Sequence, residues 1–126
     1  MAVMSVAELQ EALRAKRLSA AEAMKETLAR IARHEPAVHA FVEVYEQEAT
    51  HAAEICDAAR AAGGGLGPLA GIPIAIKDNM VDEGHLASAG SRMLQKYRSA
   101  YTATAVERLR AAGAIIVGRT NMDEFA

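Results

Sequence analysis

The sequence predicts an α/β protein, in which a helical N-terminal region precedes the start of a mixed, largely parallel sheet covered by helices. Residues 1–62 carry apolar residues mainly at helical spacing and include two Ser-x-x-Glu capping boxes. Two short apolar segments, 72–77 and 114–119, have the composition of buried strands. A helical pattern lies between these two strands, and the order strand, helix, strand favours parallel pairing through a right-handed crossover.

The N-terminal region is expected to form two helices and a short strand before its last helix. "SVAE" at 5–8 starts the first helix, which ends near Leu18. "SAAE" at 19–22 starts the second helix, which is expected to end at Pro36 because proline cannot donate the next helical hydrogen bond. Alternating apolar residues at 40–46 then predict a short strand.

A third helix is expected from Glu46 to about Ala62, and a glycine-rich loop at 63–70 follows it. The side of this helix expected to be apolar carries four residues: Ala52, Ile55, Ala59 and Ala62. The loop separates the mainly helical residues 1–62 from the core-like residues 71–126.

The second half contains the two expected buried strands and the helix that connects them. The strand at 72–77 has no polar residue before its last position, so both of its faces are expected to be covered. Thr102 can cap a helix at 102–113, and Gly113 can end it. The strand at 114–119 is apolar until its last residue.

Composition excludes several classes of function. The net charge is −2, the pI is about 6.1 and no basic block is present, so direct nucleic-acid binding by this chain is not indicated. A single cysteine, Cys56, cannot form an internal disulfide and fits a reducing compartment. The N-terminus lacks the pattern of a signal peptide, and no apolar run has the length of a membrane span. A cytoplasmic, non-membrane protein is expected.

The chain has the length of one domain but the composition of an incomplete one. Alanine supplies much of its 52% apolar content, and there are two phenylalanines and no tryptophan. The last residues, "TNMDEFA", follow a buried-type strand that little remaining chain could cover. Residues 1–126 are therefore expected to be the N-terminal portion of a larger single domain.

Lys77, which ends the strand at 72–77, is the candidate catalytic residue. Side chains alternate along a strand, so Lys77 and Asp78 should point to opposite faces. Ligand sites in open α/β sheets lie beyond the carboxyl ends of strands, and burial there would favour a neutral amine able to act as a general base. The alternative is a solvated lysine at the start of a turn.

Two segments resemble the amidase signature family: "GPLAGIPIAIKDN" at 67–79 and "YTATAVERLRAAGAIIVGRTNMDEFA" at 101–126. The resemblance extends loosely from residue 5 and closely from Gly67. It implies the amidase signature fold, incomplete here, with residues 71–126 as the start of its core. Within the family, "GRTNMDEF" points to subunits of tRNA-dependent amidotransferases.

The resemblance implies a Ser–cis-Ser–Lys triad with Lys77 in the lysine position, and hydrolysis of glutamine to release ammonia. The resemblance also implies partner subunits B and C and a mischarged tRNA. ATP and Mg would be used through a partner, with no cofactor bound by this chain. Both serines of the triad lie beyond residue 126, so this chain alone is expected to be inactive.

Two alternatives remain: a stand-alone amidase of the same family acting on a small amide, and a non-catalytic helical interaction module. The loop "VDEGHLASAGS" at 81–91 departs from the family pattern because it carries Asp82, Glu83 and His85. The four histidines lack metal-ligand spacing, so no metal site is expected. Asp123 and Glu124 are expected to have scaffold roles.

Overall fold

The computed structural model describes residues 4–126; residues 1–3, at the start of the segment tested above for a signal peptide, lie outside it. The described elements are α1 (Val6–Arg14), α2 (Ala20–Val38), β1 (Phe41–Val44), α3 (Glu46–Ala61), β2 (Pro73–Lys77), the short 3₁₀ helix η1 (Arg92–Leu94), α4 (Thr104–Ala111) and β3 (Ile115–Thr120). The α/β class and the order of its elements are therefore as predicted. No helix within 4–126 has the length and apolar character needed to cross a bilayer.

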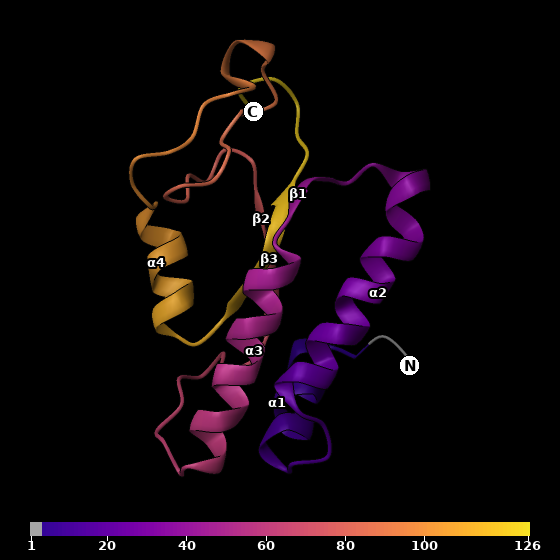
Figure 1. The fold of residues 1–126 in the computed structure, drawn as a ribbon, viewed down its shortest axis with the longest axis vertical. Helices are drawn as coiled ribbons and strands as arrows, with labels where there is room; N and C mark the ends of the chain where they lie inside the picture. The colour runs from indigo at the N-terminus through magenta and orange to yellow at the C-terminus, as the bar shows by residue number, and fades with distance from the viewer. Residues whose placement is uncertain (1–3) are drawn as a thin grey trace.

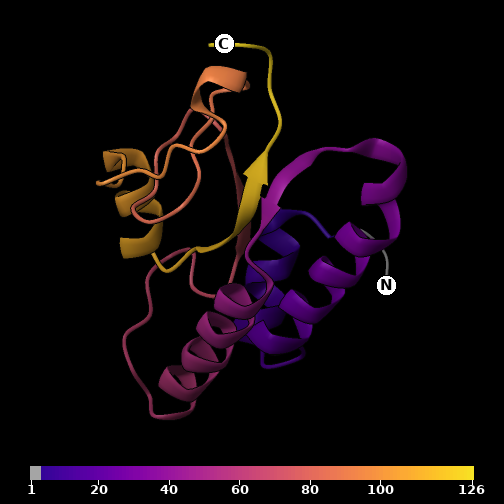
Figure 2. The same ribbon diagram turned by 45° about the horizontal axis from the view of Figure 1, so that its top comes forward.

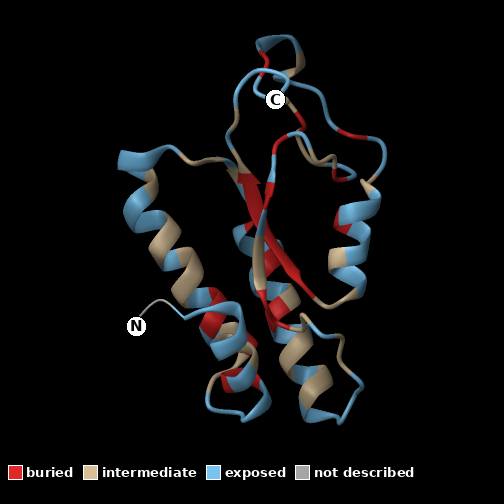
Figure 3. Ribbon diagram, turned by 180° about the vertical axis from the view of Figure 1, so that it is seen from behind, coloured by how far each residue is buried: buried red, intermediate tan, exposed pale blue. Residues whose placement is uncertain are grey.

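The strands form a mixed three-stranded sheet in the order β1-β3-β2. β2 runs parallel to β3, as predicted, and β1 runs antiparallel to β3. α1, α2 and α3 lie on one side of the sheet, and α4 lies on the other (Figures 1 and 2). β3 is buried along almost its whole length, whereas the outer helix faces are exposed (Figure 3).

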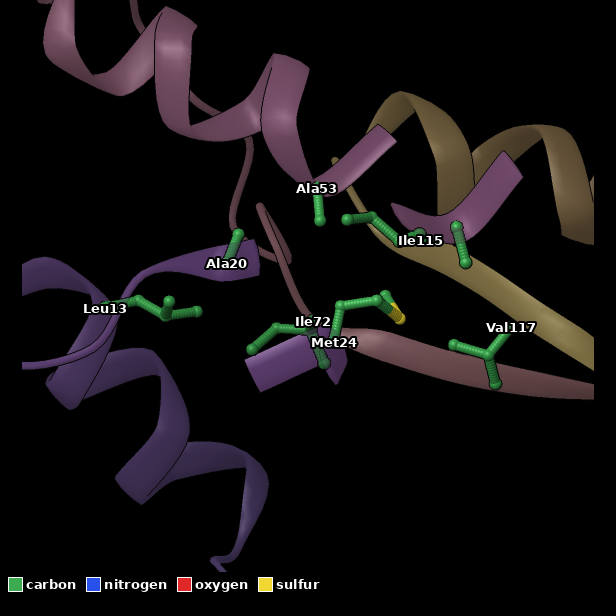
Figure 4. Close-up of a cluster of buried hydrophobic side chains, with 8 residues drawn as sticks. Leu13, Ala20, Met24, Ala53, Ile72, Ile115 and Val117 are labelled. Atoms are coloured by element: carbon green, nitrogen blue, oxygen red, sulfur yellow. The ribbon is translucent and has the colours of Figure 1, made fainter. Parts of the chain in front are cut away.

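Each face of the sheet has its own apolar cluster. The larger cluster joins the sheet to α1–α3, and its side chains converge between the helices and the strands (Figure 4). Its buried members are Leu13, Ala20, Met24, Ala49, Ala53, Ile72, Ile115 and Val117. The smaller cluster joins the sheet to α4 through Tyr45, Ile76, Val106 and Ile116. The scarcity of large aromatic residues in the larger cluster means that close packing of alanines and aliphatic residues holds this side together.

Both predicted capping boxes are formed. The Ser5 and Ser19 side chains each accept a hydrogen bond from the backbone N–H three residues later, and Glu8 and Glu22 accept in return from the cap backbone. The hydrogen bond from the Ser5 backbone lowers the pKa of Glu8 below its ordinary value. These reciprocal bonds fix the starts of α1 and α2 locally, so a short sequence pattern suffices to predict them.

The predicted end of the second helix at Pro36 is wrong by two residues. α2 continues through Pro36 to Val38, and His39 ends it in the left-handed conformation with φ of 51°. The His39 N–H donates to the Glu35 carbonyl across this turn. Because Pro36 lies in the last turn, the single helical bond it cannot donate is tolerated until the left-handed residue ends the helix.

Only part of the predicted inner face of α3 is correct: Ala52 packs against the larger apolar cluster, but Ile55 and Ala62 do not face inward. Ala49 and Ala53 are buried, whereas Ile55 is 56% exposed and Ala62 is exposed. α3 packs against both α2 and β3. Small side chains allow a helix to approach two neighbours closely, so packing selects the alanine face rather than the face with the larger residue.

Thr102 does not cap the following helix. Ala103 occupies the N-cap position of α4 without a side-chain hydrogen bond. Thr102 Oγ1 instead accepts a hydrogen bond from the Glu83 N–H at 3.0 Å, so it fixes a loop rather than the helix. The predicted stop at Gly113 is confirmed: its φ is +92°, and an added Cβ would lie 2.8 Å from Ala70 Cα.

Asp57 ties α3 to the start of α2, because its carboxylate accepts hydrogen bonds from the Ala20 and Ala21 backbone N–H groups at 2.8 and 2.9 Å. We expect Asp57→Ala to lower the free energy of unfolding by about 1–2 kcal/mol, since it removes the anion that caps α2. Chemical denaturation measures this loss. Glu54→Ala, an exposed change on the same helix, is the control and should stay within about 0.5 kcal/mol of wild type. Equal losses in the two variants would contradict the capping role.

Candidate active site

The carboxyl ends of the two parallel strands meet at one edge of the sheet. Lys77, the last residue of β2, pairs with Thr120, the last residue of β3. The loops between β2 and α4 and the C-terminal residues 121–126 lie at this same end of the molecule (Figure 1). This is the edge at which open α/β sheets bind ligands, so it is the candidate site.

Lys77 lies on the open face of β2. Ile76 and Asp78 are buried and Lys77 is exposed, which is the alternation that the sequence predicts. Within residues 4–126 one face of this strand is open, and not both faces covered as predicted, because Ala75 is exposed as well. The Lys77 ammonium has no ion-pair partner among residues 4–126. The described residues therefore do not supply the desolvation that the general-base hypothesis requires.

Asp78 is the centre of a buried hydrogen-bond network at this edge. Its side chain is 1% exposed. The carboxylate accepts hydrogen bonds from the Ser88 N–H at 3.2 Å, from the Ser88 hydroxyl, and from the Gly90 N–H at 3.5 Å. Arg119 Nε donates to the same carboxylate at 3.0 Å. One side chain therefore joins the end of β2, the end of β3 and the loop at 88–90.

Arg119 is fully buried and satisfied at the sheet edge. Besides the carboxylate, it donates to the Asp78 carbonyl at 3.0 Å and to the Met80 carbonyl at 2.8 Å. Buried guanidinium groups need such partners because desolvation of the charge is costly. This arginine was not predicted from the sequence, in which it is only the residue that ends an apolar strand.

A β-bulge explains how Arg119 reaches Asp78. The β2–β3 register moves from Ile74 opposite Ile116 to Ala75 opposite Gly118, which leaves Val117 as the extra residue. The bulge turns Arg119 away from the face that Val117 occupies and toward the side of α4. A Cβ at Gly118 would lie 2.4 Å from the Glu43 carbonyl oxygen, so the close approach of β1 requires glycine. A glycine inside an otherwise apolar strand was the available sequence signal.

The unusual loop at 81–91 contains a second buried carboxylate. Asp82 is 1% exposed and accepts two hydrogen bonds from Arg110 of α4, at 2.5 and 2.8 Å. The hydrogen bond to Asp82 raises the pKa of Arg110 above its ordinary value. Unlike Arg119, Arg110 keeps 42% of its side chain exposed. Asp82 therefore anchors the start of this loop to α4.

His85 anchors the same loop to Tyr45, which lies between β1 and α3, and to Glu48 of α3. Its ring stacks on Tyr45 with centroids 4.0 Å apart, and its Nε2 lies 3.3 Å from a Glu48 carboxylate oxygen. Burial raises the pKa of the Tyr45 phenol above its ordinary value. Within residues 4–126, no three histidine, cysteine or acidic side chains are arranged to hold a metal ion. Asp82 and His85, two of the atypical residues of the loop, thus hold the loop against its neighbours.

The C-terminal residues contact the other end of this loop. Ser91 Oγ donates to Glu124 at 2.7 Å, and the Phe125 N–H donates to the Ala89 carbonyl at 2.8 Å. The contact agrees with the scaffold role expected for Glu124. An added Cβ at Gly90 would lie 2.8 Å from the Asp123 carbonyl oxygen, so the two segments are in close contact.

The sequence and the fold of this chain match a known class of enzyme. The family model described as Amidase matches residues 22–126. The chain belongs to the amidase family. Solved structures agree: a peptide amidase from Stenotrophomonas maltophilia is 38% identical with a TM-score of 0.91, over 99% of this chain and 26% of that chain. A bacterial aryl acylamidase of the amidase signature family is 26% identical, also with a TM-score of 0.91, over 97% of this chain and 26% of that chain.

Similar curated proteins include A subunits of glutamyl-tRNA(Gln) amidotransferases. The A subunit of the glutamyl-tRNA(Gln) amidotransferase from Symbiobacterium thermophilum is 50% identical over 98% of this chain and 26% of its own length. The protein of the same name from Salinispora arenicola is 48% identical over 98% of this chain and 25% of its own length. The resemblance predicted from the motifs is confirmed. The chain spans about a quarter of the length of the curated relatives it matches.

Proposed function

We propose that this chain is the N-terminal part of a glutamine-hydrolysing subunit of a tRNA-dependent amidotransferase. The observation that carries the proposal is the 50% identity to the A subunit of a glutamyl-tRNA(Gln) amidotransferase along 98% of this chain. The whole complex would convert Glu-tRNA(Gln) to Gln-tRNA(Gln), or Asp-tRNA(Asn) to Asn-tRNA(Asn). It would act in the cytoplasm with subunits B and C, and ATP and Mg would be used through the partner subunit.

In the proposed mechanism, Lys77 acts as the base of a Ser–cis-Ser–Lys triad. Its neutral amine takes a proton from the bridging serine, which takes one from the nucleophilic serine. The nucleophile attacks the side-chain amide of glutamine, ammonia leaves, and water hydrolyses the acyl-enzyme. The position of Lys77 at the carboxyl end of β2 supports this role. Its exposed side chain within residues 4–126 requires that the remaining part of a full-length subunit cover it.

A stand-alone amidase is the second candidate, because the matched solved structures include a peptide amidase and an aryl acylamidase. The test uses the full-length protein, alone and with partner subunits B and C. Transfer of ammonia from glutamine to Glu-tRNA(Gln) or Asp-tRNA(Asn), dependent on both partners and ATP, is expected. Hydrolysis of peptide or aryl amides without partners, and no transfer with them, would establish the second candidate instead.

The 126-residue chain alone should release no ammonia from glutamine. The reason is that the resemblance places both serines of the triad outside these residues, so no nucleophile is available beside Lys77. Ammonia is measured after incubation of the purified chain with glutamine, and Lys77→Ala in the same chain is the control. Release above that control would contradict the assignment of the nucleophile.

A further inference from the structure

We propose that Asp78 is a positioning residue for the amide site: clamped by Arg119, it holds segment 88–91 beside the strand end that carries Lys77. The inference rests on the proposed amidase function and concerns residues other than the triad. Segment 88–91 would then form a fixed wall against which the substrate amide is aligned.

The contacts of Asp78 on segment 88–91 come from both its side chain and its backbone. The carboxylate accepts from the Ser88 hydroxyl and from the Ser88 and Gly90 N–H groups. The Asp78 carbonyl accepts from the Ala89 N–H at 3.3 Å. Because Asp78 is bonded covalently to Lys77, any movement of segment 88–91 relative to Asp78 is also a movement relative to the proposed base.

The backbone of this segment is held in an unfavourable conformation. Ala89 has φ of +48° and Gly90 has φ of +68°. A residue with a Cβ pays an energetic cost in this region, and such a residue persists where its surroundings fix it. Here the hydrogen bonds to Asp78, and the bond from Phe125 to the Ala89 carbonyl, supply that fixation. A strained loop fixed at the strand end that carries a candidate base is a pattern expected of a binding wall.

The burial of the Asp78–Arg119 pair indicates that it is kept for orientation rather than for stability. The two side chains are 1% and 0% exposed. Removing both charges from water costs about as much as their attraction returns, so apolar residues would stabilise this edge equally well. An apolar pair could not orient the Ser88 hydroxyl or the two loop N–H groups. The carboxylate can do so only while Arg119 fixes its own position.

Asp82 provides a matched comparison within the same loop. It is as buried as Asp78 and is also paired with an arginine, Arg110. Its hydrogen-bond partners, Arg110 and Thr102, both lie outside segment 88–91. Asp82→Asn should therefore reproduce the loss of a buried charged partner without releasing the proposed wall.

The experiment compares Asp78→Asn, Gly90→Ala and Asp82→Asn in the full-length protein. Gly90→Ala displaces the segment by steric conflict and leaves the Asp78–Arg119 pair intact, because its Cβ would meet the Met122 and Asp123 carbonyl oxygens at 2.8 Å. Three quantities are measured: the melting temperature, kcat and KM for glutamine hydrolysis, and hydrogen exchange of the amides at 88–91.

We expect Asp78→Asn and Gly90→Ala each to speed exchange at 88–91 and to lower kcat by about 10- to 100-fold, as displacement of a positioned group does. Asp82→Asn should lower the melting temperature but keep kcat within about twofold of wild type. If Asp78→Asn does not fold, the kcat of Gly90→Ala tests the inference. Unchanged kcat in the folded variants, or an equal kcat loss in Asp82→Asn, would overturn the inference.

A wild-type protein that hydrolyses no amide would refute the proposed function separately. In that case, hydrogen exchange of the amides at 88–91 still tests whether Asp78 positions this segment. Faster exchange at 88–91 in Asp78→Asn, without the same change in Asp82→Asn, supports it. Equal protection in both variants overturns it.

Discussion

Replacing Arg119 by methionine should lower the free energy of unfolding by about 3–5 kcal/mol, the cost of leaving one partner of a buried ion pair uncompensated. Arg119 is 0% exposed and Asp78 is 1% exposed, so water cannot replace the lost guanidinium without opening the sheet edge. The Asp78 and Met80 carbonyls also lose their donor. Chemical denaturation of the protein measures the loss.

Arg108→Met on the exposed side of α4 is the control, and its free energy of unfolding should stay within about 0.5 kcal/mol of wild type. The double variant Asp78→Asn/Arg119→Met separates charge from packing. It should be at least about 1 kcal/mol more stable than the sum of the single losses predicts, because no uncompensated charge remains. Additive losses would show that the two side chains act independently and would contradict the pair.

Features set by neighbouring residues could be predicted from the sequence. The capping boxes at Ser5 and Ser19 depend on residues three positions apart, and both are formed. The apolar strands and the helix between them produced the correct parallel pair β2–β3. The placement of Lys77 at a strand end followed from the same local pattern. Local patterns therefore predicted the elements and the candidate base, but not the surroundings of the base.

Features that depend on contacts across the chain could not be predicted in the same way. Asp78 and Arg119 are 41 positions apart, and they meet only because the bulge at Val117 changes which face Arg119 occupies. Alternation without the bulge would place Arg119 on the face of Val117, in the larger apolar cluster. The alanine face of α3 was missed for a related reason. Packing against two neighbours, not residue size, determined which side is buried.

Lys77 variants of the full-length enzyme should both be nearly inactive in glutamine hydrolysis. If Lys77 is a neutral base, Lys77→Arg should be as damaging as Lys77→Ala, because arginine keeps its proton in proteins. We expect each variant to fold and to lose about 100-fold or more in rate, within the range of general-base contributions. Steady-state hydrolysis by the assembled complex measures the loss, and circular dichroism checks the fold. Lys96→Arg, an exposed change, is the control.

The two Lys77 substitutions together separate three roles for this side chain. A solvated strand end would tolerate arginine, and alanine would cost only a few tenths of a kcal/mol in stability. A structural cation would let arginine recover much of what alanine loses. Both variants are equally inactive only if the side chain must be deprotonated in order to act as a base. Near-normal activity of Lys77→Arg would therefore end the general-base assignment, even if Lys77→Ala were inactive.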